Sequence, residues 1–411
     1  MHGKPPAAAR RTFYGWYVAY ALMVVSTMTA GFLFYNVSVL LEAFVGERGF
    51  AVELASFATG VFFVASGVAG LVVGRVINRV DARKIIVASA GVTAIALASV
   101  GYLRTEAELV AFYVVLGLCY GGCGLVTAST IVARWFDRKR PQALSVASTG
   151  LSLGGIVITP FVAYFIKAYG LTATGPFLGA AFFLGVVPVT LLFVRASPHE
   201  MGLSPDGAEA MPGVAGAATI TGVSFSKAWK SRFFVAVTLA YVFSLGAQVG
   251  AIAHIFRLVV TRADAQLAAV AVALLAGTSL VGRLISGQLL LRIPARAFTL
   301  ALMANQTVAL AFLAFAETKV ALLAGVTLFG LTIGTILMMH QLLLAEAFGA
   351  REYGRIYATS QLVTVIGVAA WPALIGFIFV ASGGYEWPYL VTALSTMSGA
   401  AILSLSGPAR R

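Results

Sequence analysis

Twelve apolar stretches decide what this chain can fold into, because each is long enough to span a bilayer as a helix, which takes about 20 residues. The chain has 411 residues, of which 60% are hydrophobic and 10% charged, so it is too apolar and too long for one soluble core. We therefore predict an all-α, polytopic membrane protein with twelve transmembrane helices. Their predicted ranges are 14–40, 53–74, 85–103, 108–133, 142–166, 175–194, 233–260, 266–291, 297–316, 319–345, 355–381 and 387–406.

Basic residues collect on one side of the predicted membrane. The net charge of +13 alone would suit a nucleic-acid partner, but most of the 28 Lys and Arg residues lie in loops on the same side as both termini. The opposite side holds six of them: Arg48, Arg104, Lys167, Arg257, Arg262 and Lys319. Cytoplasmic loops carry such an excess. We therefore predict cytoplasmic termini, a bacterial inner-membrane location, the lipid bilayer as a partner and no nucleic-acid partner.

The first residues and the cysteines point to no additional chemistry. Residues 1–11 are basic and run directly into a full-length span, which predicts a cytosolic leader rather than a cleaved signal peptide. Cys119 and Cys123 lie four residues apart on one predicted helix, where side chains point the same way and do not easily form a disulfide. No metal-ligand spacing accompanies them, so we expect helix-packing residues and no metal site.

The chain contains an internal repeat at an offset of about 212 residues. Ala133, Phe136, Gly155 and Pro160 are matched, each 212 residues later, by Ala345, Phe348, Gly367 and Pro372. Such a parallel repeat is typical of the two six-helix halves of major facilitator transporters. We predict two pseudo-symmetric six-helix bundles, 1–194 and 233–411, joined by a cytoplasmic linker, 195–232.

The loop after the second span carries a glycine, an amide and a run of charges. Its residues are Gly74, Asn78, Arg79, Asp81 and Arg83. This pattern resembles the 2–3 loop motif of the major facilitator superfamily, in which a short basic loop latches the halves together on the cytoplasmic side. The chain departs from it at Asn78, where the family has Asp, and at Asp81, where the family has Gly. The resemblance implies a cytoplasmic gate in which Asp81 partly replaces the missing carboxylate.

Three further patches are similar to one branch of that superfamily. Residues 134–150, the triplet 14–16 and Arg283 resemble the monocarboxylate transporters and the related bacterial oxalate/formate antiporters. The resemblance covers the whole chain at the level of the fold. It implies a secondary active transporter that works by alternating access, with substrate bound between the halves near the membrane midplane.

Arg283 lies deep inside the eighth apolar span. A fixed cation there is costly, and intramembrane ionisable residues are functional candidates by default. Its planar guanidinium matches a carboxylate with two parallel hydrogen bonds. Ser279 and Ser286 lie one turn before and one turn after it, which predicts a polar stripe on one helix face. We therefore predict that Arg283 binds the carboxylate of a small organic anion.

Other spans offer polar side chains for the same site. We predict that Tyr120, Asn36 and Gln248, together with Ser279, line it. Animal monocarboxylate transporters carry an aspartate at the place of Ser279 and a lysine near that of Asn36, so their proton handling does not carry over. His254 is the candidate for proton coupling, because imidazole titrates in the useful range. His340 is interpreted as a helix contact.

The absence of acidic residues within the spans narrows the range of possible substrates. No Asp or Glu lies deep in a span, which disfavours export of cationic drugs. Residues 356–380 hold no charge, whereas the oxalate/formate antiporters use a second cation in this helix, so one carboxylate fits better than two. We predict transport of lactate- or pyruvate-like monocarboxylates with proton symport. Carboxylate exchange of the oxalate/formate type is the alternative.

Two other classes of function are less consistent with the sequence. A transporter-like ligand sensor would need a foldable output segment, and neither terminus nor the linker offers one. An enzyme would need a nucleophile–base set, a metal cluster or a phosphate-binding loop, and none is visible. We expect no enzymatic activity and no cofactor.

Overall fold

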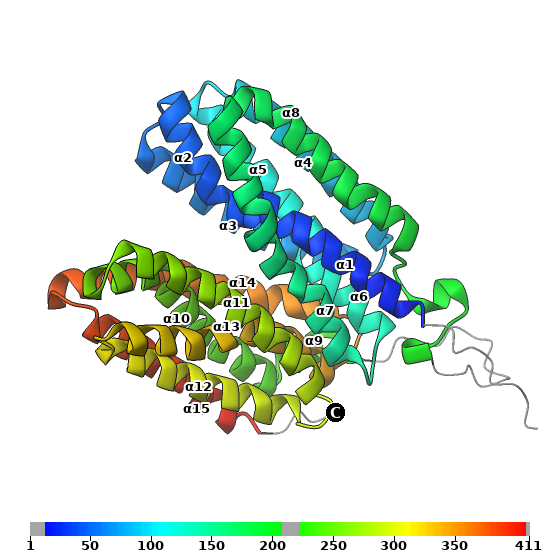
Figure 1. Cartoon of the computed structure of the whole chain (residues 1–411). Coiled ribbons are helices and arrows are strands. Elements are labelled where there is room, and N and C mark those ends of the chain that lie inside the picture. Colours follow the sequence, from blue (N-terminus) through cyan, green and yellow to red (C-terminus); the bar gives the residue numbers. More distant parts are fainter. Residues whose placement is uncertain (1–12, 208–221, 408–411) are drawn as a thin grey trace, which may run out of the picture.

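The computed structural model describes residues 13–207 and 222–407, and within these ranges its regular structure is helical. The predicted basic leader, residues 1–11, and residues 208–221 of the predicted linker lie outside the described residues. Figure 1 shows two helical halves, one of residues 15–193 and the other of residues 232–405. We refer to them as the N-half and the C-half.

The N-half contains five of the eleven helical runs that are long and apolar enough to span a membrane. Its elements are α1 (Gly15–Thr29), η1 (Ala30–Tyr35), α2 (Asn36–Arg48), α3 (Val52–Val76), α4 (Ala82–Ser99), η2 (Val100–Tyr102), α5 (Glu106–Cys123), α6 (Leu125–Trp135), α7 (Arg140–Leu153), η3 (Gly154–Ile158) and α8 (Thr159–Phe193). The segments η1 and η3 are π-helical and contact each other. A Cβ on Gly154 would lie 2.6 Å from the backbone nitrogen of Gly31, so the close approach requires glycine.

The fifth and sixth predicted spans are joined in one helical run of 54 residues, Arg140–Phe193. The run is broken at Gly170, whose φ of 75° and ψ of 166° are not helical and favour glycine. The side chain of Glu47 accepts a hydrogen bond of 2.8 Å from the backbone N–H of Leu171, just after the break. The break separates two membrane-length segments, so the eleven runs provide the twelve predicted spans.

The C-half consists of six long helices. They are α10 (Arg232–Arg262), α11 (Ala265–Leu289), α12 (Ala295–Phe315), α13 (Lys319–Phe348), α14 (Tyr353–Ser382) and α15 (Glu386–Leu405). Side-chain caps fix several of their first turns, since the oxygens of Ser231, Asp264 and Thr318 accept hydrogen bonds from backbone N–H groups three residues later.

The segment that joins the halves lies at one end of the molecule. Its short helices are η4 (Pro198–Met201), η5 (Pro205–Gly207) and α9 (Phe225–Trp229). We call this end the linker end. Figure 1 shows the two halves meeting at the linker end and diverging toward the opposite end.

Hydrogen bonds join the halves at the linker end. Arg140 donates from Nη1 to the carbonyl oxygen of Ala345 at 3.2 Å. Gln142 Nε2 donates to Gln288 Oε1 at 3.0 Å. These contacts connect α7 of the N-half to α13 and α11 of the C-half. The molecule is therefore closed at the linker end.

Candidate substrate site

Arg283 bridges the two halves. It lies in α11, about 9 Å before the end of that helix at the linker end, and its side chain is 3% exposed. Its Nη1 donates to the carbonyl oxygen of Ser148 in α7. The hydroxyl of Ser145, one turn earlier in α7, donates to the carbonyl oxygen of Arg283 at 2.7 Å. The cation predicted from the sequence is therefore buried at the interface between the halves.

A glycine on α13 makes room for the guanidinium. A Cβ on Gly334 would lie 2.5 Å from Arg283 Nε and would also overlap Nη2. Within the described ranges Nε has no hydrogen-bond partner, and none of the ion pairs found there includes Arg283. An arginine can bind a carboxylate through two parallel N–H bonds. Arg283 therefore keeps a donor available for an anion.

Aromatic side chains of the N-half lie opposite this arginine. Tyr35, the last residue of η1, packs on Gly155 of η3, about two turns after Ser148, whose carbonyl oxygen accepts from Arg283. Tyr120, in α5, is partly buried and packs against Phe34, with ring centroids 6.1 Å apart and planes 25° apart. The structure thus brings Tyr120 and Arg283 into one neighbourhood, with Tyr35 as a member that the sequence analysis did not include.

Two other predicted site residues are buried. Ser279 lies one turn before Arg283 in α11. Asn36, the first residue of α2, is fully buried, and neither its amide nitrogen nor its amide oxygen has a partner in the part of the chain that the structure describes. An unpaired buried amide costs about 1–3 kcal/mol. Both amide atoms of Asn36 are therefore able to bind another polar group.

Gln248 and His254 are held by other partners. Gln248 Nε2 donates to Gln306 Oε1 at 2.8 Å, inside the C-half. The Nε2 atom of His254 is 3.0 Å from the carbonyl oxygen of Pro372, and its Nδ1 is 3.2 Å from the hydroxyl of Tyr385. A carbonyl only accepts, so Nε2 carries the proton and Nδ1 of the neutral ring accepts from the tyrosine. The roles of both residues remain predictions.

A second polar cluster lies inside the C-half around His340. Its ring stacks on that of Tyr241, with centroids 4.2 Å apart, and its Nε2 is 2.8 Å from Ser360 Oγ. Tyr357 approaches the same ring at 5.4 Å. The signal in the sequence was the polar stripe 353, 357, 360 and 364 at helical spacing in α14. The prediction for this helix considered only its lack of charged residues and did not use the stripe.

The predicted gate motif lies at the linker end. There Gly74 packs against Gly354 of α14, and a Cβ on Gly74 would be 2.5 Å from the carbonyl oxygen of Gly354. Asn78 accepts from Arg134 Nη2 at 2.7 Å and donates to the carbonyl oxygen of Arg351 in the C-half at 3.1 Å. The amide therefore joins the halves without a carboxylate. Arg79 is exposed.

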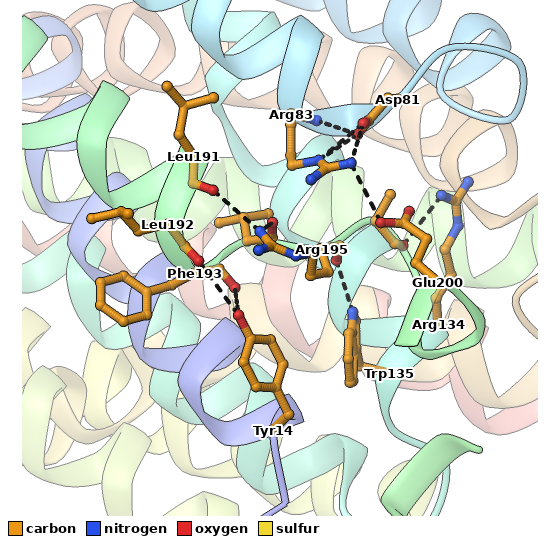
Figure 2. A network of polar contacts seen from close by, with 12 residues as sticks. Tyr14, Asp81, Arg83, Arg134, Trp135, Leu191, Leu192, Phe193, Arg195 and Glu200 are labelled. Atoms are coloured by element: carbon orange, nitrogen blue, oxygen red, sulfur yellow. Dashed lines mark hydrogen bonds and ion pairs between the residues drawn. The ribbon is translucent and has the colours of Figure 1, made fainter. Parts of the chain in front are cut away.

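Asp81 acts locally, at the start of α4. Its carboxylate accepts from the backbone N–H of Arg83 at 2.9 Å and pairs with the guanidinium of Arg83 at 2.7 Å, as Figure 2 shows. Burial raises the pKa of the Asp81 carboxyl, but the hydrogen bonds and charge of Arg83 outweigh burial and hold it below its ordinary value. Arg83 also approaches Glu200 in η4 at 3.5 Å.

The start of the linker is fastened to the N-half beside this pair. Trp135 Nε1 donates to the carbonyl oxygen of Arg195 at 2.8 Å (Figure 2). The hydroxyl of Tyr14 donates to the carbonyl oxygen of Phe193 at 3.2 Å. The carboxylate of Asp206 accepts from the backbone N–H groups of residues 137, 138 and 139. Part of the linker is therefore bound to the loop that precedes α7.

A comparison with known protein families identifies the family of this chain. Residues 23–372 match the Major Facilitator Superfamily. The chain belongs to this superfamily. Its all-α fold and its membership of the superfamily, both predicted from the sequence, are confirmed, and the chain is an integral membrane transporter.

Several curated major facilitator proteins are similar to the chain. It is 26% identical to MFS-type transporter 1 of Ophiocordyceps sp. over 88% of this chain and 79% of that protein. It is 26% identical to monocarboxylate transporter 13 of Bos taurus over 72% of this chain and 67% of that protein. The 30% identity to the transporter pynF of Aspergillus niger covers only 34% of this chain and 32% of that protein.

Solved structures of this superfamily have the same fold. The Escherichia coli transporter FucP in its outward conformation has a TM-score of 0.72 and 17% identity, over 95% of this chain and all of that chain. The human organic anion transporter MFSD10 has a TM-score of 0.71 and 14% identity, over 97% of this chain and all of that chain. Identities this low show the shared fold alone.

Proposed function

We propose that this transporter carries small organic monocarboxylates and binds their carboxylate at Arg283. The observation that carries the proposal is the buried guanidinium of Arg283 at the interface of the halves. Among the described residues, no group accepts a hydrogen bond from its Nε. A cation in such a place is costly without an anion. An exchangeable carboxylate satisfies it and crosses the membrane when the halves move. The similarity to a protein named monocarboxylate transporter 13 supports the same class.

The experiment compares uptake in vesicles reconstituted with the full chain. Labelled lactate is the substrate, and pyruvate, acetate, formate and oxalate compete. We expect each monocarboxylate to outcompete oxalate at equal concentration, because the site has one cation. We expect Arg283→Ala to lose at least nine tenths of uptake and Arg283→Lys to lose most of it, since lysine lacks the planar fork.

The control for this experiment is Arg104→Ala, which removes an exposed cation at the opposite end of the N-half. It should transport normally. All variants are first compared by size-exclusion chromatography and thermal melting, so that loss of uptake is not loss of fold. Normal uptake by Arg283→Ala would show that the arginine is not the anchor.

We propose proton symport as the coupling, because a monoanion and a proton cross together without net charge. His254 supports this proposal, since it is only partly buried and hydrogen-bonds a tyrosine hydroxyl. His254→Gln should flatten the pH dependence of uptake, whereas His340→Gln, which changes a fully buried ring, should not. Uptake that ignores the proton gradient and requires an internal carboxylate would instead favour anion exchange.

We also propose that the linker end faces the cytoplasm of a bacterial inner membrane, as the excess of basic residues indicates. Asp137, whose side chain is largely exposed, offers a position for a cysteine label at this end. The two native cysteines are buried and should give little background. An impermeant maleimide should label Asp137→Cys only after the cells are opened, and labelling of intact cells would reverse the orientation.

A further inference from the structure

Four aromatic rings of the N-half form one continuous group, which we call the aromatic wall. Its members are Phe34, Tyr35, Phe63 and Tyr120. The ring of Phe34 is in the centre: its centroid is 5.0 Å from Tyr35, 5.8 Å from Phe63 and 6.1 Å from Tyr120. The first two contacts are edge to face and the third is stacked. Three helical segments, η1, α3 and α5, therefore contribute to one aromatic surface.

The aromatic wall faces the C-half. Phe63 lies one turn before Gly67 in α3, where a Cβ would lie 2.8 Å from Leu362 of α14. Tyr35 packs on Gly155, about two turns after Ser148, whose carbonyl oxygen accepts from Arg283 of α11. These contacts involve two separate helices of the C-half, α14 and α11. The wall and the proposed carboxylate anchor are therefore on opposite sides of the same interface.

Two rings of the wall are partly exposed. Phe34 is 38% exposed and Tyr35 is 39% exposed, whereas Arg283 across from them is 3% exposed. One side of the Tyr35 ring packs on Gly155 of η3, where a Cβ would lie 3.1 Å from the ring. The exposed surface is aromatic, and it lies near the buried guanidinium of Arg283. An acetate or a lactate held by Arg283 is too small to cover both rings.

We propose that the aromatic wall binds the body of the substrate, so that the preferred substrates are aromatic monocarboxylates of the arylacetate class. Their carboxylate lies on Arg283 and their ring packs against Phe34 and Tyr35. Aromatic pairs gain free energy beyond the area they bury, through offset-stacked and edge-to-face contacts. This inference rests on the proposed function, because it uses the same arginine as the anchor.

The test is the binding of two acids of nearly equal size to the purified full chain in detergent, measured by calorimetry. Phenylacetate and cyclohexylacetate share the carboxylate and the carbon count, and only the first has an aromatic ring. We expect phenylacetate to bind about fivefold more tightly, which is the size of one aromatic pair. Acetate should bind more weakly than either.

Variants of the aromatic wall test which rings cause the preference for phenylacetate over cyclohexylacetate. Phe34→Leu keeps an apolar side chain but removes the central ring, and it should bring the ratio of the two affinities close to one. Tyr35→Leu should lower the ratio as well, and it provides an independent variant if the first does not fold. The matched control is Phe315→Leu in α12, where the ring is 63% exposed on a helix at the outside of the C-half (Figure 1). Its ratio should not change.

The outcomes separate this inference from the proposed function. Equal affinities for the two acids, with binding that is lost in Arg283→Ala, would overturn the aromatic preference and leave the carboxylate site intact. Binding that persists in Arg283→Ala would overturn the anchor and the proposed function with it. Absence of binding by either acid to the unaltered protein would overturn the aromatic class.

Discussion

At the scale of single residues, the sequence indicated the cation of the site but not what holds it. Arg283 stands out in an apolar span, so its importance follows from the cost of a buried charge. Its contacts with Ser148 and Gly334 join helices that are far apart in the chain. Contacts of that kind depend on how helices pack within and between the halves, and no local pattern of residues reports them.

Gly334 offers a direct test of that packing. In Gly334→Ala the new methyl group would overlap Nε and Nη2 of Arg283, so the guanidinium must move. We expect the affinity for monocarboxylates to fall by about tenfold, the effect of losing one charge-assisted hydrogen bond. Calorimetry on the purified variant measures it. Gly277→Ala in α11 is the control, because nothing lies within 4 Å of its Cβ; equal affinities in both variants would contradict the role of Gly334.

At the scale of helices, the apolar stretches predicted the number and approximate ranges of the spans well, because each must cross the same thickness of hydrocarbon. The details that shape the site were not predicted. The π-helical segment η1, which carries Phe34 and Tyr35, and the break at Gly124 between α5 and α6 leave the apolar pattern unchanged. The segment η1 lies where Gly31 approaches Gly154 of another helix.

The start of α4 should be sensitive to pH through Asp81. Its pKa is lower in the folded protein than in the unfolded chain, so its contribution to stability is present above the ordinary Asp value of about 3.9 and is lost as the pH falls through the folded value. Asp81→Asn keeps a capping side chain but not the charge. We expect its melting temperature to lie below that of the unaltered protein at pH 7 and to approach it once the pH falls below the folded pKa of the Asp81 carboxyl. A difference that persists in acid would contradict the electrostatic origin.

At the scale of the whole molecule, the repeat of about 212 residues and the excess of basic residues predicted two halves and an orientation. They did not predict which end is closed. The structure closes the linker end, where α7 contacts α11 and α13, and leaves the halves apart at the other (Figure 1). Transport by alternating access requires the opposite arrangement in turn. The polar contacts at the linker end must therefore break in each cycle.

A reversible cross-link between the halves tests this requirement. Gln142 in α7 and Gln288 in α11 hydrogen-bond across the interface at 3.0 Å, so cysteines at both positions lie within reach of a short bifunctional thiosulfonate. We expect the cross-linked double variant to lose uptake in vesicles, because the linker end cannot open, and to regain it after reduction. Binding of a monocarboxylate from the open end should continue, which separates a locked transporter from a damaged one. The single variants Gln142→Cys and Gln288→Cys, treated with the same reagent, should transport normally. Full uptake by completely cross-linked protein would show that the halves do not separate at the linker end, and that substrate passes by another route.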